Sequence, residues 1–407
     1  MSTHVLSHIP GSIATLPLSE QGNGSAFDAI NRPSGPPQGF PASVEGPMVW
    51  SAAQGNPVNA SLLQLQPEDV IELEAALKSF QALELDGDQI SREHFRLPNL
   101  GSRLAQCALE VHRGSGMCIV RGLAPGQYTP ELNTMLFLGI ASYIGDQRGV
   151  QNSSGYMLSH VVESKSWTVP REKRHGIHTN NSLPFHNDMG CEILSMQVRD
   201  CAVTGGHTNV ASVGAIYNEM MQNDSWAVDL LAQSNWPVRV AKKDSSYVLS
   251  PLLEFHDGKL MISMDPSRVG PHPNGPVGLV PRLLPEQQAA LSLLQRHAAN
   301  LQVPLQTRSG DMVFLNNYAV LHARDAYEDG ESSARHLVRM WLRNSELGWQ
   351  IPSSMHIPWD AVFGQRAKKV RNLQYPVDPL PEYMAPKYSN GTAAFVGDEE
   401  DEDEIVE

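Results

Sequence analysis

The stretch Leu183-Pro-Phe-His-Asn-Asp-Met189 decides how the chain is interpreted, because it places a histidine and an aspartate two residues apart after an apolar lead-in. On a β-strand, residues two apart point to the same face, so we expect His186 and Asp188 to point into one cavity. An imidazole and a carboxylate in this arrangement are two of the three ligands of a 2-His-1-carboxylate site, which binds non-haem Fe(II) and leaves open coordination positions. The third ligand must come from elsewhere in the chain.

The stretch Gly310-Asp-Met-Val-Phe-Leu-Asn-Asn-Tyr-Ala-Val-Leu-His-Ala-Arg324 supplies the best candidate for that ligand. A turn leads into an apolar run that ends at His322, as expected for a second buried strand that delivers a histidine. The ordinary alternatives are a His–Asp hydrogen bond at the first motif and a plain core or surface histidine here, since the chain has 15 histidines. Asn316, Asn317 and Tyr318 either line the pocket or cap a turn.

A third strand is predicted by Arg335-His-Leu-Val-Arg-Met-Trp-Leu-Arg343, in which Arg335 and Arg339 share one face. A buried arginine needs an anion, and its planar fork matches a carboxylate held by two parallel hydrogen bonds. The dicarboxylate cosubstrate 2-oxoglutarate would satisfy it. The alternative for Arg335 is a salt bridge to Asp325 or Glu328, and Arg339 is equally suited to neutralise a buried acid.

The order and spacing of these histidines, aspartate and arginine resemble the taurine dioxygenase and TfdA-like family of Fe(II)/2-oxoglutarate-dependent dioxygenases, over roughly residues 116–349. The segment Gly205-Gly-His-Thr-Asn-Val-Ala-Ser-Val-Gly-Ala-Ile-Tyr-Asn-Glu219 is similar to the family's Gly-Gly-x-Thr block. The resemblance implies an α+β fold with a double-stranded β-helix (jelly roll, clavaminate-synthase-like) flanked by helices. It further implies Fe(II) on the triad, 2-oxoglutarate held by Thr208 and Arg335, O2 as oxidant and stimulation by ascorbate.

Arg339 matches a family position that in some members faces an anionic group of the substrate. Here it leaves three options open, namely a substrate carboxylate or sulfonate, the cosubstrate, or support of the sheet.

The activity implied by the resemblance is oxidation of a C–H bond, with release of succinate and CO2. The carboxylate of Asp188 favours hydroxylation, desaturation or a related oxidation, because family-like halogenases lack this ligand. The N-terminal region resembles that of fungal members, so the substrate is expected to be a small organic acid or a secondary-metabolite intermediate. Two alternatives stand beside this hypothesis, a cupin-like metalloenzyme without 2-oxoglutarate and a non-catalytic jelly-roll binding protein.

Composition bounds the remaining possibilities. The 407 residues carry a formal net charge of −14, which argues against binding to nucleic acid. The four cysteines show no C-x-x-C spacing, and neither a signal peptide nor a membrane-spanning stretch is recognisable. We therefore expect a cytoplasmic protein with reduced thiols and a small-molecule substrate. Its oligomeric state is not readable from the sequence.

The predicted organisation has four parts: an extended or disordered arm over 1–45, a helical region over 46–115, a catalytic domain over 116–365, and an extension over 366–407 with an acidic disordered tail. Helices are expected from Pro67, over Leu100–His112, from Thr129 to near Gly145, over Ser212–Gln222 and over Pro285–Ala299. The first of them should bury Val70, Ile71, Leu73, Leu77 and Phe80. The polar segment 146–181 is expected to be an irregular lid loop.

Overall fold

The computed structural model describes residues 35–54, 57, 61–152, 154–240, 247–272, 277–331, 333–369 and 374–383. The chain divides into two compact units, Met1–Pro33 and Ser34–Glu407, and every described residue belongs to the second unit. The predicted arm up to residue 34 and the predicted acidic tail lie outside the described residues. The predicted domain boundaries within 34–407 stay predictions.

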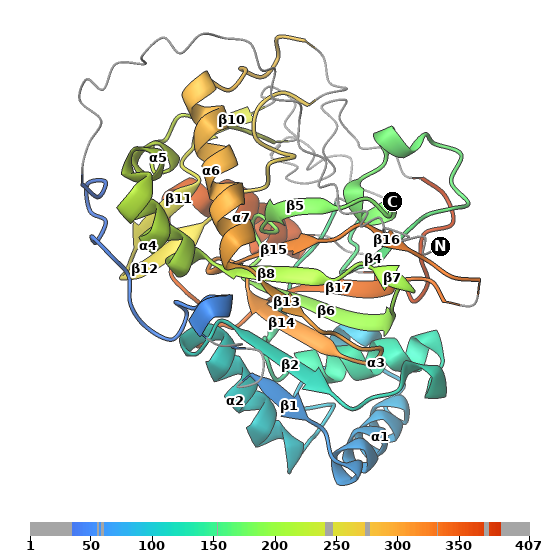
Figure 1. Cartoon of the computed structure of the whole chain (residues 1–407). Coiled ribbons are helices and arrows are strands. Elements are labelled where there is room, and N and C mark those ends of the chain that lie inside the picture. The colour runs from blue at the N-terminus through green and yellow to red at the C-terminus, as the bar shows by residue number, and fades with distance from the viewer. Residues whose placement is uncertain are drawn as a thin grey trace, which may run out of the picture. The chain divides into compact units, whose positions relative to one another are not determined.

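The larger sheet has seven strands and runs through the middle of the second unit (Figure 1). In spatial order its strands are β1 (Leu62–Gln64), β2 (Met117–Arg121), β14 (Met312–Asn316), β6 (Ile193–Asp200), β17 (His336–Arg343) and β3 (Gln147–Arg148), with β4 (Leu158–Val162) also paired to β17. Only the β1–β2 pair is parallel among these described pairings.

A four-stranded antiparallel sheet carries the metal motif. Its order is β13 (Val303–Leu305), β8 (Thr208–Ser212), β15 (Val320–Arg324) and β5 (Leu183–His186). Three two-stranded ribbons complete the described sheets: β9 (Trp236–Arg239) with β10 (Tyr247–Ser250), β11 (Leu253–His256) with β12 (Lys259–Ile262), and β7 (Thr204–Gly205) with β16 (Tyr327–Glu328).

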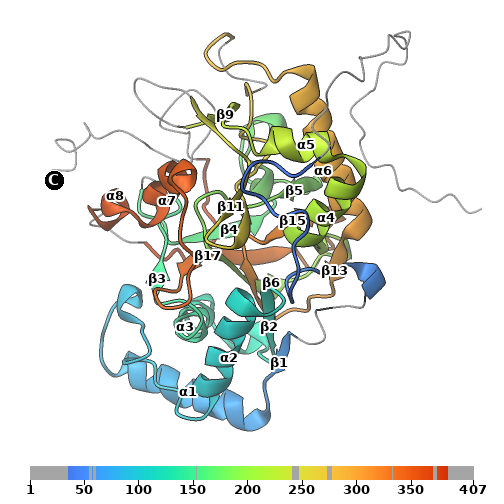
Figure 2. The same cartoon turned by 90° about the vertical axis from the view of Figure 1, so that its left-hand side faces the viewer.

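Side-chain alternation on the strands builds three packed layers. On β14, Met312 and Phe314 pack into the core shared with the first three helices, whereas Val313 and Leu315 pack into a core that both sheets share. A third core lies between the four-stranded sheet and the next three helices. The helices are α1 (Pro67–Gln81), α2 (Leu100–Arg113), α3 (Pro130–Ala141), α4 (Val213–Asn223), α5 (Ser225–Leu231), α6 (Pro285–Leu301), α7 (His356–Phe363) and α8 (Gln365–Lys369). Figure 2 shows α1–α3 gathered on one side and α4–α6 on the other.

The mixed helix-and-sheet architecture expected from the sequence is confirmed. Helix α1 begins at Pro67 as predicted, but its predicted face is wrong at Ile71, which is 66% exposed because it lies off the stripe of Leu73, Leu77 and Phe80. Helix α3 ends at Ala141, before the predicted stop.

The prediction that 146–181 is wholly irregular is also wrong. Leu158–Val162 forms strand β4 because its backbone pairs with β17, a partner far away in sequence. The predicted arm is described from residue 35 onward, and there Val44 exchanges two 2.8 Å hydrogen bonds with the side chain of Asn218 on α4.

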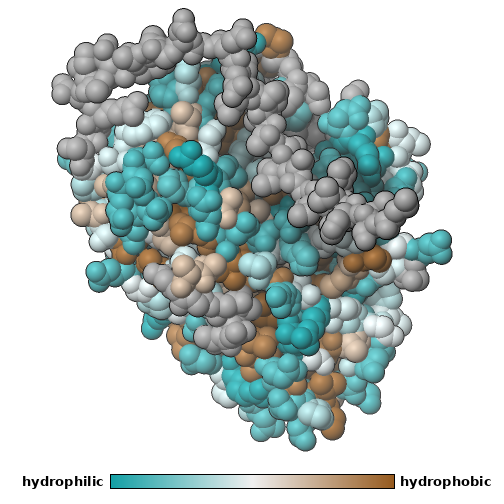
Figure 3. Space-filling model, in the orientation of Figure 1, coloured by the Kyte–Doolittle hydropathy of each residue, from teal (hydrophilic) through white to brown (hydrophobic). Residues whose placement is uncertain are grey.

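No helix within the described residues is long and apolar enough to cross a membrane. On the face shown in Figure 3, hydrophobic and hydrophilic residues are intermixed.

Candidate active site

Strand pairing brings the two predicted histidine ligands together. In the antiparallel β5–β15 pair, His186 lies directly opposite His322, and the centroids of their rings are 4.2 Å apart. Strand β5 ends at His186, so Asp188 reaches the site from the turn that follows the strand. The prediction that both side chains leave the same strand face is therefore wrong for Asp188. One ligand atom from each of the three residues lies within 4.8 Å of the others, a spacing suited to one metal ion.

The turn that carries Asp188 is shaped by two buried amide side chains. The amide oxygen of Asn187 accepts from the backbone N–H of Met264 at 2.7 Å, and its Nδ2 donates to the carbonyl of Ile262 at 2.8 Å. Asn317 holds the backbone of Asp188 through its own amide. Amides that satisfy backbone groups end the strand and fix the turn.

This answers the question left open for Asn317, which shapes the site by capping. The role of Asn187 escaped the sequence analysis. Its place between the two candidate ligands was the only signal, and an asparagine there is also common in ordinary turns.

The carboxylate of Asp188 is held in its ionised form. Its Oδ2 accepts a hydrogen bond of 2.7 Å from Nε1 of Trp341 and lies 3.0 Å from Nη1 of Arg339. Burial alone would raise the pKa of Asp188, but the charge of Arg339 outweighs it and holds the pKa well below its ordinary value. The option that Arg339 neutralises a buried acid is therefore the one seen in this structure.

His322 is suited to bind a metal ion as a neutral imidazole. Burial, and then the charge of His186, lower the pKa of His322 to about 3. Nδ1 of His186 lies 2.8 Å from the carbonyl oxygen of Pro184, an orienting contact that leaves Nε2 as the ligand atom. Nδ1 of His322 is buried and has no hydrogen-bond partner among the described residues. The donor set therefore fits Fe(II), for which two imidazoles and one carboxylate are a known combination.

Arg335 lies directly before β17 with its side chain buried and only partly satisfied. Its Nε donates to the carbonyl of Gly206 at 2.9 Å and its backbone N–H donates to Oδ1 of Asp329 at 2.7 Å, while Nη1 is buried without a partner. In the described part of the chain no carboxylate, including those of Asp325 and Glu328, lies within ion-pair distance of its guanidinium. A buried guanidinium of this kind fits an incoming carboxylate.

The predicted Gly-Gly block lies against that arginine. Gly205 and Gly206 have φ angles of +72° and +70°, a backbone region that favours glycine. A Cβ on Gly206 would lie 2.7 Å from Cδ of Arg335, and one on Gly205 would lie 2.2 Å from the carbonyl oxygen of Ala326. Glycines at these positions let the backbone approach Arg335 closely enough to accept its hydrogen bond.

Thr208 is buried on β8, directly opposite Arg324 on β15, just as Val210 lies opposite His322. Val210 packs into the core between the sheets, so the alternating side chains of Thr208, His322 and Arg324 also face that interior. Arg324 is a second buried arginine that the sequence analysis missed. The available signal was its position two residues after His322.

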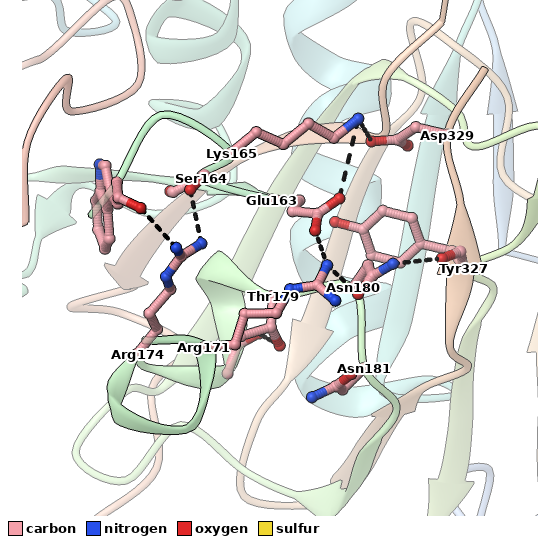
Figure 4. A network of polar contacts seen from close by, with 12 residues as sticks. Glu163, Ser164, Lys165, Arg171, Arg174, Thr179, Asn180, Asn181, Tyr327 and Asp329 are labelled. Atoms are coloured by element: carbon pink, nitrogen blue, oxygen red, sulfur yellow. Dashed lines mark hydrogen bonds and ion pairs between the residues drawn. The ribbon is translucent and has the colours of Figure 1, made fainter. Parts of the chain in front are cut away.

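The segment before the metal motif folds onto itself through arginines (Figure 4). Arg174 donates to the carbonyls of Ser164 and Trp167, both at 2.7 Å. Arg171 donates to Oδ1 of Asn180 at 2.9 Å. The expected lid is thus a structured loop with two short 3-10 turns, Arg171–Lys173 and Gly176–His178.

Comparison with solved structures relates the fold to that of known oxygenases. An asparagine oxygenase in complex with Fe(II), 2S,3S-3-hydroxyasparagine and succinate is similar with a TM-score of 0.55 and 16% identity, over 70% of this chain and 93% of that one. The non-haem iron oxygenase OrfP in complex with Fe and alpha-ketoglutaric acid has a TM-score of 0.52 and 15% identity, over 70% and 94%. At these identities the likeness shows the fold.

Sequence comparison identifies the family. The Stachybotrys chartarum protein "Taurine hydroxylase-like protein SAT17" is 33% identical over 349 residues, which are 82% of this chain and 88% of that protein. The FR-33289 synthase of Streptomyces rubellomurinus is 24% identical, over 77% of this chain and 93% of that enzyme. The family model "Taurine catabolism dioxygenase TauD, TfdA family" matches residues 63–341. The chain therefore belongs to the TauD/TfdA family of Fe(II)/2-oxoglutarate-dependent dioxygenases, as its sequence motifs predict.

Proposed function

We propose that His186, Asp188 and His322 hold the catalytic Fe(II) and that the enzyme hydroxylates a C–H bond of a small organic acid. The observation that carries the proposal is the convergence within 4.8 Å of three ligand atoms, one each from His186, the ionised Asp188 and the neutral His322. When bound, Fe(II) with 2-oxoglutarate and O2 supplies the oxidising chemistry.

The chain's own residues bind and orient the reactants. Arg335 and Thr208 hold the far carboxylate of 2-oxoglutarate, since an unpaired buried guanidinium donor and a buried hydroxyl suit a carboxylate. Trp341 and Arg339 keep Asp188 ionised and aimed at the metal. Holding the substrate's C–H bond beside the metal supplies the remaining rate enhancement through orientation.

The proposed substrate carries an acidic group. Nη1 of Arg339 lies 3.0 Å from Oδ2 of Asp188 and therefore beside the proposed metal position. The planar guanidinium of Arg339 at this position favours an anionic substrate group.

The relatives support this substrate class and reaction. The fungal relative's name refers to taurine, and the solved asparagine oxygenase holds a hydroxylated amino acid and succinate. A role in secondary metabolism, suggested by the likeness of the N-terminal region to fungal members, is part of the same proposal.

We also assign the two facing sheets to a double-stranded β-helix of the jelly-roll type. A core shared by both sheets supports this assignment. A cytoplasmic location is proposed because all four cysteines, each within the described residues, are free thiols.

The test is succinate formation by Fe(II)-loaded protein given 2-oxoglutarate, ascorbate and O2, together with anaerobic titration of the visible absorbance of the Fe(II)–2-oxoglutarate chelate. We expect wild-type protein to show both signals. His186→Ala should abolish them, whereas His256→Ala, at an exposed histidine on β11, should not. Arg335→Ala should weaken 2-oxoglutarate binding, and Arg96→Ala, at an exposed arginine, should leave it unchanged.

Folded, iron-loaded wild-type protein without a chelate band would refute the proposal and favour the non-catalytic binding protein. Metal-dependent turnover of an organic acid without any need for 2-oxoglutarate would favour the cupin-like alternative.

A further inference from the structure

A pair of buried arginines shares one aromatic ring next to the metal site. The guanidinium carbons of Arg324 and Arg335 lie 5.2 and 5.3 Å from the ring centroid of Tyr327, and the two arginine residues are only 5% and 4% exposed. Nε and Nη1 of Arg324 and Nη1 of Arg335 are buried and have no acceptor among the described residues. Two buried guanidinium cations with three unpaired nitrogens need a negative charge nearby. The ring and hydroxyl group of Tyr327 do not supply it.

The third guanidinium nitrogen of Arg324, Nη2, donates its hydrogen bonds to the loop before the metal motif. Its Nη2 donates to the carbonyls of Thr179 at 2.9 Å and Gly176 at 3.3 Å, and also to that of Asn181. One guanidinium therefore holds three backbone carbonyls with one nitrogen and presents two other nitrogens to an interior that it shares with Arg335. The loop and these two unpaired nitrogens are therefore joined through a single planar group.

The same loop has a second attachment that does not involve Arg324. Nδ2 of Asn180 donates to the carbonyl of Tyr327 at 3.1 Å, and the N–H of Tyr327 donates to the carbonyl of Asn180 at the same distance. Lys165 lies 3.4 Å from Asp329, whose other oxygen accepts from the backbone of Arg335. Figure 4 shows Asn180 beside Tyr327 and Lys165 beside Asp329. Asn180 and Lys165 therefore both contact the segment 327–329, which lies shortly before Arg335 and touches its backbone through Asp329.

We propose that Arg324 is a second positioning residue for the far carboxylate of 2-oxoglutarate and that it couples cosubstrate binding to ordering of loop 176–181. This inference rests on the proposed function. A carboxylate received by Arg335 and by the free edge of Arg324 neutralises both cations and fixes the plane of the Arg324 guanidinium. Its Nη2 is then held rigidly against the three loop carbonyls, so binding of 2-oxoglutarate tightens the loop that precedes the metal ligands.

The test compares two 2-oxo acids in anaerobic, Fe(II)-loaded protein by titration of the chelate absorbance. 2-Oxopentanoate has the chelating end and chain length of 2-oxoglutarate but lacks the far carboxylate. Arg324→Gln should weaken 2-oxoglutarate binding roughly tenfold or more and leave 2-oxopentanoate binding nearly unchanged, since a charged hydrogen bond of this kind is worth at least a factor of ten. The preference between the two acids therefore falls by the same factor.

Asn180→Ala is the matched control, because it removes a loop attachment and leaves both arginines in place. It should change the binding of both acids equally and keep their ratio. Amide hydrogen exchange over 176–181 gives a second readout. Adding 2-oxoglutarate should protect the loop in wild-type and Asn180→Ala protein, but not in Arg324→Gln.

The outcomes separate this inference from the proposed function. If wild-type protein binds neither acid, the proposed function fails. If it binds both and Arg324→Gln keeps the wild-type ratio, or keeps the ligand-induced protection, Arg324 is only structural and the inference is overturned. Should Arg324→Gln not fold, Arg324→Lys serves instead, because an ammonium keeps the charge but lacks the planar fork that reaches the loop and the carboxylate together, and a smaller loss of preference is expected.

Discussion

Asn317 clamps the peptide backbone of Asp188 from both sides. Its Oδ1 accepts from the Asp188 N–H at 3.0 Å, and its Nδ2 donates to the Asp188 carbonyl at 2.7 Å and to that of Cys191 at 2.8 Å. Asp188 follows the end of a strand, so no neighbouring strand among the described residues pairs with its backbone. The amide of Asn317 supplies the backbone hydrogen bonds that such a strand would make. The position of the proposed iron ligand thus depends on a residue of the strand-to-strand turn between β14 and β15.

Asn317→Ala should lower Fe(II) affinity about 10–100-fold, as is typical when an orienting partner of a metal ligand is lost. Unpaired backbone groups should also cost about 1–3 kcal/mol of unfolding free energy. Asn316→Ala is the control, because this buried amide accepts from the N–H of Tyr318 and does not touch Asp188. Equal Fe(II) affinities of the two variants, measured by anaerobic titration, would contradict the prediction.

Trp341→Phe should weaken Fe(II) binding by about tenfold while the protein stays folded. The substitution removes the 2.7 Å indole hydrogen bond to Asp188 and keeps an aromatic ring where Arg339 lies 5.0 Å from the ring centroid. Trp359→Phe is matched to it, since the buried Nε1 of Trp359 has no partner among the described residues. A similar loss of metal affinity in both variants would show that ring size, and not the hydrogen bond, is responsible.

Gly206→Ala should raise the dissociation constant for 2-oxoglutarate by pushing Arg335 away, because the new Cβ would lie 2.7 Å from Cδ of Arg335. We expect roughly a tenfold change, as for loss of one charged hydrogen bond. Gly258→Ala controls for backbone strain, since Gly258 has nearly the same φ, +69°, and nothing within 4 Å of its Cβ position. If both variants bind 2-oxoglutarate like wild type, the proposed role of the Gly-Gly block is wrong.

Stability should fall as the pH drops below about 6.5, partly through a histidine pair on the seven-stranded sheet. Nδ1 of His160 and Nε2 of His336 lie 2.7 Å apart, and burial followed by the charge of His160 lowers the pKa of His336 to about 3. Between about pH 6.5 and 3 the unfolded chain therefore binds a proton at His336 that the folded chain does not, and folding is disfavoured increasingly toward low pH.

The measurement is urea unfolding of metal-free protein at pH 8 and pH 5. His336→Gln should lose less stability between these values than wild type, by about 1.4 kcal/mol per pH unit at most. His256→Gln, at an exposed histidine, should keep the wild-type slope. An unchanged slope in His336→Gln would rule out this pair as a source of acid sensitivity.

The sequence by itself determined the parts of the site that follow from local periodicity. The alternation in 335–343 predicted a strand, and β17 places Arg339 within 3.0 Å of Asp188. The proline signal placed the start of α1 at Pro67, because helix-start signals act within one turn of the chain. The His-x-Asp motif identified His186 and Asp188 as candidate ligands, because this prediction needed only the identity and spacing of two nearby residues.

Only the tertiary structure decided which residues meet. The β5–β15 register sets His186 opposite His322, and strand β4 exists because β17 offers it a partner. The importance of Arg324 depends on the ring of Tyr327, which it shares with Arg335. Strand register and burial arise from packing between segments far apart in sequence, so local patterns alone do not determine them.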